Sequence, residues 1–295
     1  MAPAIERTAA PLNEEAVRAW DTVLYERWKR HRPIFVGGAS VFSERAFETD
    51  PPAPGERCID FGCGFGDTTQ RLAEITGPEG SAHGVDSSPM FIRDAEAEAA
   101  EAGAQNVSFE VADVQMGEWE PVHDYAFARF GTQFFANPVQ GMRAIRSSLK
   151  PGGRLCKIVW RRKVDVPVFS ETEIVAERFL DHPEENLADT CGPGPFSMGN
   201  PDTTRGILEA AGFDEIELVQ QDNDYLMGQD LDEAVEIALA IGPAAELVRV
   251  NGPEGERRKP EIAAALRESL AGWQLPNGTV RGPSSVWKVT ARNPG

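Results

Sequence analysis

Positive charge, cysteine and long apolar runs are all scarce in this sequence. The chain of 295 residues has 29 Lys and Arg against 47 Asp and Glu, which gives a formal net charge of −18 at pH 7. This excess of negative charge repels phosphate backbones and anionic lipid, so we expect neither nucleic acid nor a membrane surface as a partner. No apolar stretch approaches the ~20 residues that a membrane-spanning helix needs.

Cysteine is rare, and its spacing fits neither a disulfide framework nor a zinc site. The four cysteines are Cys58, Cys63, Cys156 and Cys191, and none of them forms a CxxC motif. Residues 1–10 lack the apolar core of a signal peptide. Together these absences predict reduced, buried thiols in a cytoplasmic protein.

Short apolar runs alternate with amphipathic runs through the middle of the chain. The apolar runs cover residues 58–61, 82–85, 107–111, 125–128 and 154–160. The amphipathic runs between them cover residues 67–76, 89–102 and 138–149. Strands that alternate with helices predict βαβ units, right-handed crossovers and a mainly parallel sheet.

Further helices and strands are expected outside this region. The expected helices cover residues 12–31, 168–180, 202–211, 231–241 and 256–271, and the expected strands cover 215–220 and 285–292. The pattern divides the chain into an N-terminal helical cap segment (1–50), a cofactor-binding core (51–160) and a second half of the sheet (161–295). Within the second half, we expect residues 161–205 and 230–272 to be insertions that add helices to the cap.

A glycine-rich turn follows the first strand. Gly62, Gly64 and Gly66 form a GxGxG pattern, whereas a dinucleotide-binding turn has the pattern GxGxxG. The position of the last glycine in that pattern is taken by Asp67. We expect Asp67 to be the N-cap of the next helix, with Gln70 completing a capping box. A carboxylate at this helix end disfavours binding of the pyrophosphate of NAD.

Each of the first three strands ends near an acidic residue. Asp60 lies before the glycine turn, where a carboxylate suits an ammonium group. Asp86 ends the second strand about 20 residues after the turn, where an acid suits a ribose diol. Asp113 follows the third strand and is placed to accept a hydrogen bond from an adenine amino group. A site for ammonium, ribose and adenine without phosphate fits S-adenosylmethionine.

Four segments, in this order, resemble the motifs of class I S-adenosylmethionine-dependent methyltransferases. They read IDFGCGFGD, GVDSSPMF, VADV and LKPGGRL. The resemblance is to the small-molecule branch related to the ubiquinone and menaquinone methyltransferases, and it covers residues 55–220 and the final strand, 285–291. It implies an α/β, Rossmann-like, mainly parallel seven-stranded sheet with an antiparallel last strand and a helical cap.

The resemblance also implies which residues hold S-adenosylmethionine, whose product is S-adenosylhomocysteine. The residues that would flank its methionine part are Asp60, Gly62, Gly64 and Gly66. Those that would hold its ribose and adenine are Asp86, Ser87, Met90, Asp113 and Val114.

The segment ARFGTQFF, residues 128–135, follows the fourth strand and bears on the substrate. Amide and exocyclic-amine methyltransferases usually carry an Asn/Asp-Pro-Pro-aromatic motif there, and metal-dependent catechol-type enzymes place acidic ligands nearby. That motif is absent, so we expect neither amides nor exocyclic amines as substrates, and because Arg129 stands where acidic ligands would be, we expect no metal. As a whole, the sequence predicts an O- or N-directed transfer to a small-molecule metabolite. The guanidinium of Arg129 would pair either with a protein carboxylate, such as Asp113 or a glutamate of the cap, or with an anionic group of the substrate or of the cofactor's methionine.

Candidates for a catalytic base lie in the segments expected to cover the cofactor. His31 follows the N-terminal helix, His182 follows the helix after the fifth strand, and Tyr25 offers a hydroxyl group. The aromatic residues that could wall an apolar or aromatic substrate pocket are Trp20, Tyr25, Trp28, Phe134 and Phe135. Core packing is the alternative role for Trp20 and Trp28.

Two other functions fit parts of this pattern. A cofactor-binding protein without catalysis would have the same cofactor site beside a filled or solvent-open substrate cavity. An NAD-dependent oxidoreductase would share the alternating strands and helices but is disfavoured by Asp67. The sequence is also compatible with a homodimer.

Overall fold

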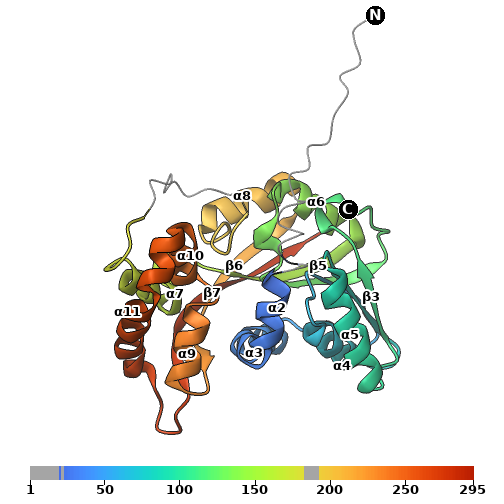
Figure 1. Ribbon diagram of the computed structural model, residues 1–295. Coiled ribbons are helices and arrows are strands. Elements are labelled where there is room, and N and C mark those ends of the chain that lie inside the picture. Colours follow the sequence, from blue (N-terminus) through green and yellow to red (C-terminus); the bar gives the residue numbers. More distant parts are fainter. Residues whose placement is uncertain (1–19, 21–22, 183–192) are drawn as a thin grey trace, which may run out of the picture.

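The computed structural model describes Trp20 and residues 23–182 and 193–295 of the chain. Its centre is a seven-stranded sheet with the strand order β3-β2-β1-β4-β5-β7-β6 (Figure 1). The strands are β1 (Arg57–Phe61), β2 (Ser81–Asp86), β3 (Val107–Val111), β4 (His123–Arg129), β5 (Leu149–Trp160), β6 (Asp214–Gly228) and β7 (Val280–Arg292). Neighbouring strands among β1 to β5 are parallel, and β7 is antiparallel to both β5 and β6. The expected fold class is therefore confirmed.

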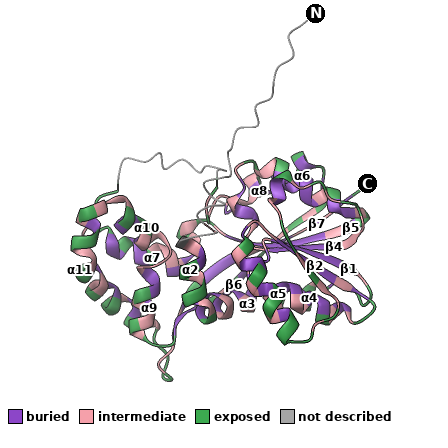
Figure 2. Ribbon diagram, turned by 45° about the vertical axis from the view of Figure 1, so that its right-hand side comes forward, coloured by how far each residue is buried: buried purple, intermediate pink, exposed green. Residues whose placement is uncertain are grey.

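Helices cover both faces of the sheet (Figures 1 and 2). On one face lie α3 (Arg32–Thr49), α4 (Asp67–Thr76) and α5 (Pro89–Glu101), and on the other lie α6 (Pro138–Ser148) and α8 (Pro201–Ala211). Side-chain oxygens of Ser88, Asn137 and Asn200 accept hydrogen bonds from the first amides of α5, α6 and α8. In each case proline takes the first helical position, where its missing N–H costs nothing. These caps explain why the three helices begin close to where the pattern predicts.

The strand order places a binding crevice at the carboxyl edge of the sheet. From β1 the chain continues to β2 and β3 on one side and then crosses to β4 and β5 on the other. Ligands of such sheets bind outside the carboxyl ends of the strands at this reversal. The ends of β1, β2 and β4, at Phe61, Asp86 and Arg129, therefore meet at the crevice.

Helix α3 is not predicted from the sequence, because its segment contains Pro33 and the consecutive glycines Gly37 and Gly38. Glycine weakens an isolated helix by about 1 kcal/mol relative to alanine. In the fold, however, α3 approaches β6 so closely that a Cβ at Gly38 would lie 2.6 Å from the ring of Tyr225. Packing against β6 thus requires glycine at position 38, although glycine has a low helix propensity.

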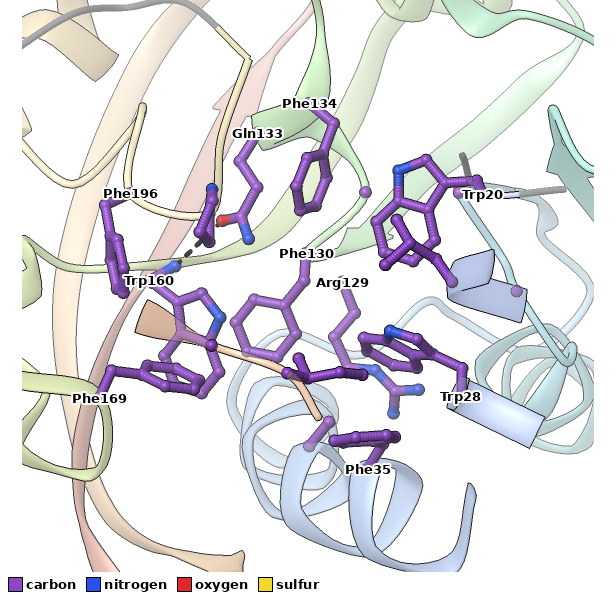
Figure 3. A pocket seen from close by; sticks show the side chains of 18 of the residues that line it. Trp20, Trp28, Phe35, Arg129, Phe130, Gln133, Phe134, Trp160, Phe169 and Phe196 are labelled. Carbon is purple, nitrogen blue, oxygen red and sulfur yellow. Dashed lines mark hydrogen bonds between the residues drawn. The ribbon is translucent and has the colours of Figure 1, made fainter. Parts of the chain in front are cut away.

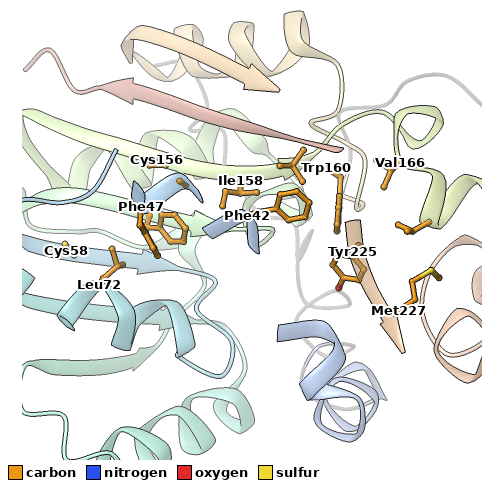
Figure 4. Packing of buried hydrophobic residues seen from close by; sticks show 14 of the residues in the cluster. Phe42, Phe47, Cys58, Leu72, Cys156, Ile158, Trp160, Val166, Tyr225 and Met227 are labelled. Atoms are coloured by element: carbon orange, nitrogen blue, oxygen red, sulfur yellow. The ribbon is translucent and has the colours of Figure 1, made fainter. Parts of the chain in front are cut away.

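The aromatic residues of α3 join the helix to the sheet (Figure 4). The ring of Phe42 lies 5.9 Å from that of Trp160 at the end of β5, and the ring of Phe47 lies 4.7 Å from that of Phe127 in β4. All four rings are buried in one apolar cluster. This cluster holds α3 against the strands whose ends form the crevice.

Residues at the N-terminal side of α3 only partly match the expected helix over residues 12–31. The structure has α2 (Val23–Arg30) followed directly by α3. Residues 12–19, 21 and 22 of the expected helix lie outside the described residues.

Four helices form a lobe beside the sheet (Figure 2). They are α7 (Pro167–Ala176), α9 (Leu231–Ala238), α10 (Pro243–Val250) and α11 (Gly252–Leu270). Their apolar faces enclose a cluster of their own, which includes Val175, Leu247, Ile262 and Leu266. Helix α10 is not predicted, because its eight residues are fewer than the roughly 11–18 residues over which a helical period can be recognised. Strands β6 and β7 are longer than predicted and remain paired as far as Gly228 and Val280.

The described cysteines and helices can be compared with the expectations drawn from the composition. Cys58, Cys63 and Cys156 are buried free thiols, and Cys191 lies outside the described residues. No helix in the described part of the chain is long and apolar enough to cross a membrane.

Candidate active site

A cavity of about 960 Å³ lies between the carboxyl edge of the sheet and the helical lobe (Figure 3). Its size is at the upper end of the range of about 300–1,000 Å³ for small-molecule sites. The residues of its motif part are Gly62, Cys63, Gly64, Phe65, Asp86, Ser87, Asp113 and Val114. The residues of its aromatic part are Trp20, Trp28, Phe35, Phe130, Phe134, Trp160, Phe169 and Phe196.

The glycine turn after β1 forms one wall of the motif part. Gly62 and Gly64 have φ angles of 71° and 53°, a conformation that glycine adopts without strain. A Cβ at Gly62 would lie 2.9 Å from the Cα of Gly131, so the turn packs directly against the segment after β4. A Cβ at Gly64 would meet no atom within 4 Å, so the backbone there faces open space.

Asp86 connects this turn to the end of β2. Its Oδ2 accepts a hydrogen bond from the N–H of Gly64 at 3.0 Å, and its Oδ1 accepts one from the N–H of Ser88 at 3.0 Å. Burial raises the pKa of the Asp86 carboxyl, and these two hydrogen bonds oppose the shift by favouring the charged form. Each carboxylate oxygen has a second lone pair, so Asp86 can accept further hydrogen bonds from the cavity it lines.

Asp113 lines the cavity beyond the end of β3. Its Oδ1 accepts a hydrogen bond from the N–H of Gln115 at 3.0 Å and so begins the short helix η1 (Val114–Met116). Val114 and Ser87 line the cavity nearby. The structure thus brings these three residues together with Asp86, as the motifs predict.

Two other motif residues do not line the cavity. Met90 packs against the buried cluster of Tyr25, Phe65 and Phe91, and its sulfur lies 3.6 Å from Nη1 of Arg93. Gly66 packs against β3, since a Cβ there would lie 2.8 Å from the ring of Phe109. The expectation that Met90 adjoins the adenine finds no support, and Gly66 shapes the turn from behind.

Asp60 is also placed differently from the expectation of an ammonium-binding carboxylate. Its side chain is fully buried, and its Oδ2 accepts hydrogen bonds from the hydroxyls of Thr68 and Thr69 at 2.7 and 2.8 Å. Burial raises the pKa of Asp60 to about 6, although both hydroxyls and Arg129 favour the charged form. Asp60 does not line the cavity, so it joins β1 to the first turn of α4 rather than contacting a ligand directly.

The prediction that Asp67 is an N-cap is wrong. Gly66, in the left-handed conformation, is the N-cap of α4, and Asp67 is the first helical residue. Both carboxylate oxygens of Asp67 accept hydrogen bonds from Nη2 of Arg129, at 2.9 and 2.8 Å. Arg129 also donates to Oγ of Ser43 at 3.2 Å. Of the two partners proposed for Arg129, the structure therefore shows a protein carboxylate, but it is Asp67 and not Asp113.

This ion pair changes the argument against NAD. A carboxylate does stand at the N-terminus of α4, but the guanidinium of Arg129 neutralises it. Asp67 therefore no longer decides between the cofactors.

Tyr25 and His31 do not line the cavity, contrary to their expected catalytic role. The hydroxyl of Tyr25 donates to Oδ2 of Asp94 at 2.7 Å and accepts from Nζ of Lys29 at 2.8 Å. His31 is buried at the start of α3, where its Nε2 lies 3.8 Å from Oε1 of Glu236. Tyr25 thus links α2 to α5, and His31 lies against α9 (Leu231–Ala238).

His182 does line the cavity, together with Glu173 and Lys163. Its Nε2 lies 2.7 Å from Oε1 of Glu177 and 3.6 Å from Oε1 of Glu173. Ligand atoms of the histidine and the two glutamates lie within 4.8 Å of one another, a spacing that a metal ion would accept. Nζ of Lys163, however, already lies 2.6 Å from Oε2 of Glu173. The group is thus a network in the cavity wall, in which Lys163 and Glu173 form an ion pair and His182 is hydrogen-bonded to Glu177.

The aromatic part of the cavity was only partly predicted. Trp20, Trp28, Phe134 and Phe135 line the cavity as proposed for a substrate pocket, whereas Tyr25 does not. The residues of the aromatic part that the sequence reasoning missed are Phe130, Trp160, Phe169, Phe196 and Phe35. A signal for the first two was present, because each stands at or directly after the carboxyl end of a strand, β4 or β5.

The motif part fits S-adenosylmethionine on two observations. Open space beside Gly64 allows a ligand to approach the backbone, and Asp86 presents its carboxylate to the same space. The Lys and Arg side chains among the described lining residues, Arg129 and Lys163, are both paired with carboxylates. The site therefore lacks the unpaired cations that a pyrophosphate would favour and suits a ligand that carries a sulfonium.

The fold and this site resemble those of methyltransferases, and comparisons with known proteins find the same similarity. Residues 52–192 match the family model described as a methyltransferase domain. An aklanonic acid methyltransferase of Streptomyces sp. strain C5 is 32% identical over 112 residues, which is 38% of this chain and 51% of that relative. A nocamycin O-methyltransferase of Saccharothrix syringae is 28% identical over 193 residues, which is 61% of this chain and 67% of that relative.

A solved structure, the YcgJ protein from Bacillus subtilis, shares the fold. The TM-score is 0.55 at 14% identity, and the match covers 85% of this chain and 97% of that one. The chain spans about half the length of the first curated relative. Its residues 52–192 are thus similar to a methyltransferase domain, in line with the motifs that resemble class I S-adenosylmethionine-dependent methyltransferases.

Proposed function

We propose that the protein transfers the methyl group of S-adenosylmethionine to an oxygen or nitrogen of a bulky, mainly apolar small molecule. The bound cofactor supplies a methyl group that its sulfonium activates for displacement. The observation that supports this function best is the continuity of the cavity, whose motif part and aromatic part form one space of about 960 Å³. Such a space admits a cofactor and an acceptor in contact with each other.

The motif part would hold the cofactor. Under this proposal the direct contacts come from the backbone at Gly62 and Gly64 and from the side chains of Asp86 and Asp113. Asp86 already fixes the N–H of Gly64, so the turn is ordered before a ligand binds. A site ordered in advance loses less entropy on binding.

The aromatic part would align the acceptor and exclude water. Methyl transfer requires the nucleophile to lie in line with the methyl carbon, and orientation in a closed site supplies much of the rate enhancement of such reactions. Because Arg129 and Lys163 are both paired, the described cavity supports an apolar or aromatic acceptor more than an anionic one. The names of two relatives also point to small organic acceptors, one of them methylated on oxygen.

A base is needed only when the nucleophile arrives protonated. Among the three side chains predicted for this role, His182 is the one that lines the cavity. Its Nε2 can donate to Glu177, which would leave Nδ1 as the basic nitrogen. We therefore propose His182 as the base for a hydroxyl acceptor.

An assay with S-adenosylmethionine and a panel of apolar phenols, naphthols and arylamines tests this function. We expect at least one acceptor to gain a methyl group, detected by mass spectrometry, with S-adenosylhomocysteine formed in equal amount. Glu177→Gln should slow transfer to a phenol, because a neutral amide stabilises the imidazolium that forms on proton transfer less than a carboxylate does. Tight binding of S-adenosylhomocysteine without any methylated product across the panel would instead support a cofactor-binding protein without catalysis.

A further inference from the structure

Phe130 has a backbone conformation that bulky residues rarely adopt. Its φ angle is 61°, in the left-handed region, where a non-glycine residue costs on the order of 1–3 kcal/mol. Its N–H donates a hydrogen bond to the carbonyl oxygen of Ile158 in β5, at 2.9 Å. The conformation turns the chain out of β4 at the point where Phe130 lines the cavity. Strain of this kind concentrates at functional sites.

The ring of Phe130 rests on a rigid support. It stacks on the ring of Trp160, with centroids 4.3 Å apart and an interplanar angle of 14°. Trp160 is held in turn by edge contacts with Phe42 and Phe169, at 5.9 and 5.2 Å between centroids. Its backbone N–H donates to Oε1 of Gln133 at 3.3 Å (Figure 3). The Phe130–Trp160 stack therefore has little freedom to move.

Phe130 also stands where the two parts of the cavity meet. The next residue, Gly131, packs against the glycine turn, since a Cβ there would lie 3.0 Å from the Cα of Gly62. In Figure 3, Phe130 lies between Trp160 on one side and Trp28 on the other. Its ring also meets Phe42 edge-on, at 6.4 Å between centroids, but Phe130 is only half-buried and lines the cavity, so part of the ring is open to it.

We propose that Phe130 is a specificity-determining residue whose ring, supported by Trp160, receives a flat aromatic ring of the acceptor. The inference rests on the proposed function, because it names the acceptor class of the same site. Stacked aromatic rings attract each other beyond the effect of buried area, whereas a saturated ring of equal size gains only the area. The stack would thus select flat aromatic acceptors over saturated ones.

The test measures the affinity of the full chain for two probes in the presence of S-adenosylhomocysteine. Alizarin is the flat aromatic probe, and androsterone is the saturated one. Phe130→Leu keeps an apolar side chain but removes the aromatic face. We expect it to weaken alizarin binding by about 3- to 10-fold and androsterone binding by less than about 2-fold. Phe130→Tyr keeps the face and should bind both probes as the wild type does. Phe47→Leu, a matched change in the core outside the cavity, should alter neither affinity.

Two outcomes would overturn the inference. If Phe130→Leu weakens the binding of both probes equally, the ring of Phe130 only fills volume. If the affinity of this variant for alizarin is unchanged, the ring does not contact the ligand. If Phe130→Leu does not fold, weaker alizarin binding by Phe130→Tyr would equally count against the stack. Probe binding needs no methyl transfer, so a wild type that discriminates the probes but methylates nothing would contradict the proposed function alone.

Discussion

At about pH 6, replacement of Lys157 by Met should raise the melting temperature by about 5–10 °C, because it removes a buried charge. Lys157 lies in β5 and is fully buried. Its Nζ lies 2.8 Å from Sδ of Met198 and 3.5 Å from Oγ1 of Thr132, and it forms no ion pair with a carboxylate among the described residues. Burial lowers the pKa of Lys157 to about 7. At about 1.4 kcal/mol for each pKa unit, keeping this amine charged in the fold costs roughly 2–5 kcal/mol.

The gain should depend on pH. An unfolded lysine has a pKa of about 10.4, so below about pH 7 both states are protonated and the wild type bears the full cost. Between about pH 7 and 10 the folded amine loses its proton, and the stability of the wild type should approach that of the variant. Urea unfolding of both proteins across this range measures the difference. Lys259→Met, at a partly exposed position of α11, is the control and should show no such convergence. A Lys157→Met protein that is no more stable than wild type at any pH would contradict this account.

Replacement of Asp86 by Ala should weaken the binding of S-adenosylhomocysteine by about 10- to 150-fold, which corresponds to about 1.5–3 kcal/mol. The carboxylate bonds to the N–H of Gly64 and lines the cavity, so its loss would both loosen the turn and remove an acceptor for hydroxyl groups. Isothermal titration calorimetry of the folded variant measures the effect.

Asp124→Ala is the matched control for this change. Asp124 also accepts a backbone hydrogen bond, from the N–H of Arg57 at 3.0 Å, but it lies near the amino end of β4, at the edge of the sheet away from the cavity. Its removal should lower stability without changing the affinity for S-adenosylhomocysteine. Equal affinities of the Asp86 and Asp124 variants would show that Asp86 is not a cofactor ligand.

The order of strands and helices could be predicted because it depends on local patterns. Alternating apolar and amphipathic runs, with Ser or Asn before Pro at three helix starts, are visible in any short window of the sequence. The motif part of the site could be predicted for a related reason, since the carboxyl ends of parallel strands meet at one edge. Asp86, Asp113 and Gly64 therefore meet at the cavity where the strand ends place them.

What could not be predicted depends on contacts between distant segments. The partner of Arg129 is Asp67, 62 residues away, and the hydroxyl of Tyr25 binds Asp94, 69 residues away. No local pattern reveals such pairs, so an N-cap and a catalytic hydroxyl were the natural expectations. Gly38 in α3 is a similar case, because its reason is the ring of Tyr225. Asp60 differs, since Thr68 and Thr69 are close in sequence and could have been weighed as its partners.

Calorimetric titration of the wild-type protein with S-adenosylhomocysteine and, separately, with NAD tests the central claim most directly. The cavity joins a glycine turn, the carboxylate of Asp86 and an aromatic chamber without an unpaired cation among its described lining residues. We therefore expect S-adenosylhomocysteine to bind in the micromolar range, about −8 kcal/mol, and NAD to give no binding heat. Binding of NAD without binding of S-adenosylhomocysteine would contradict the account.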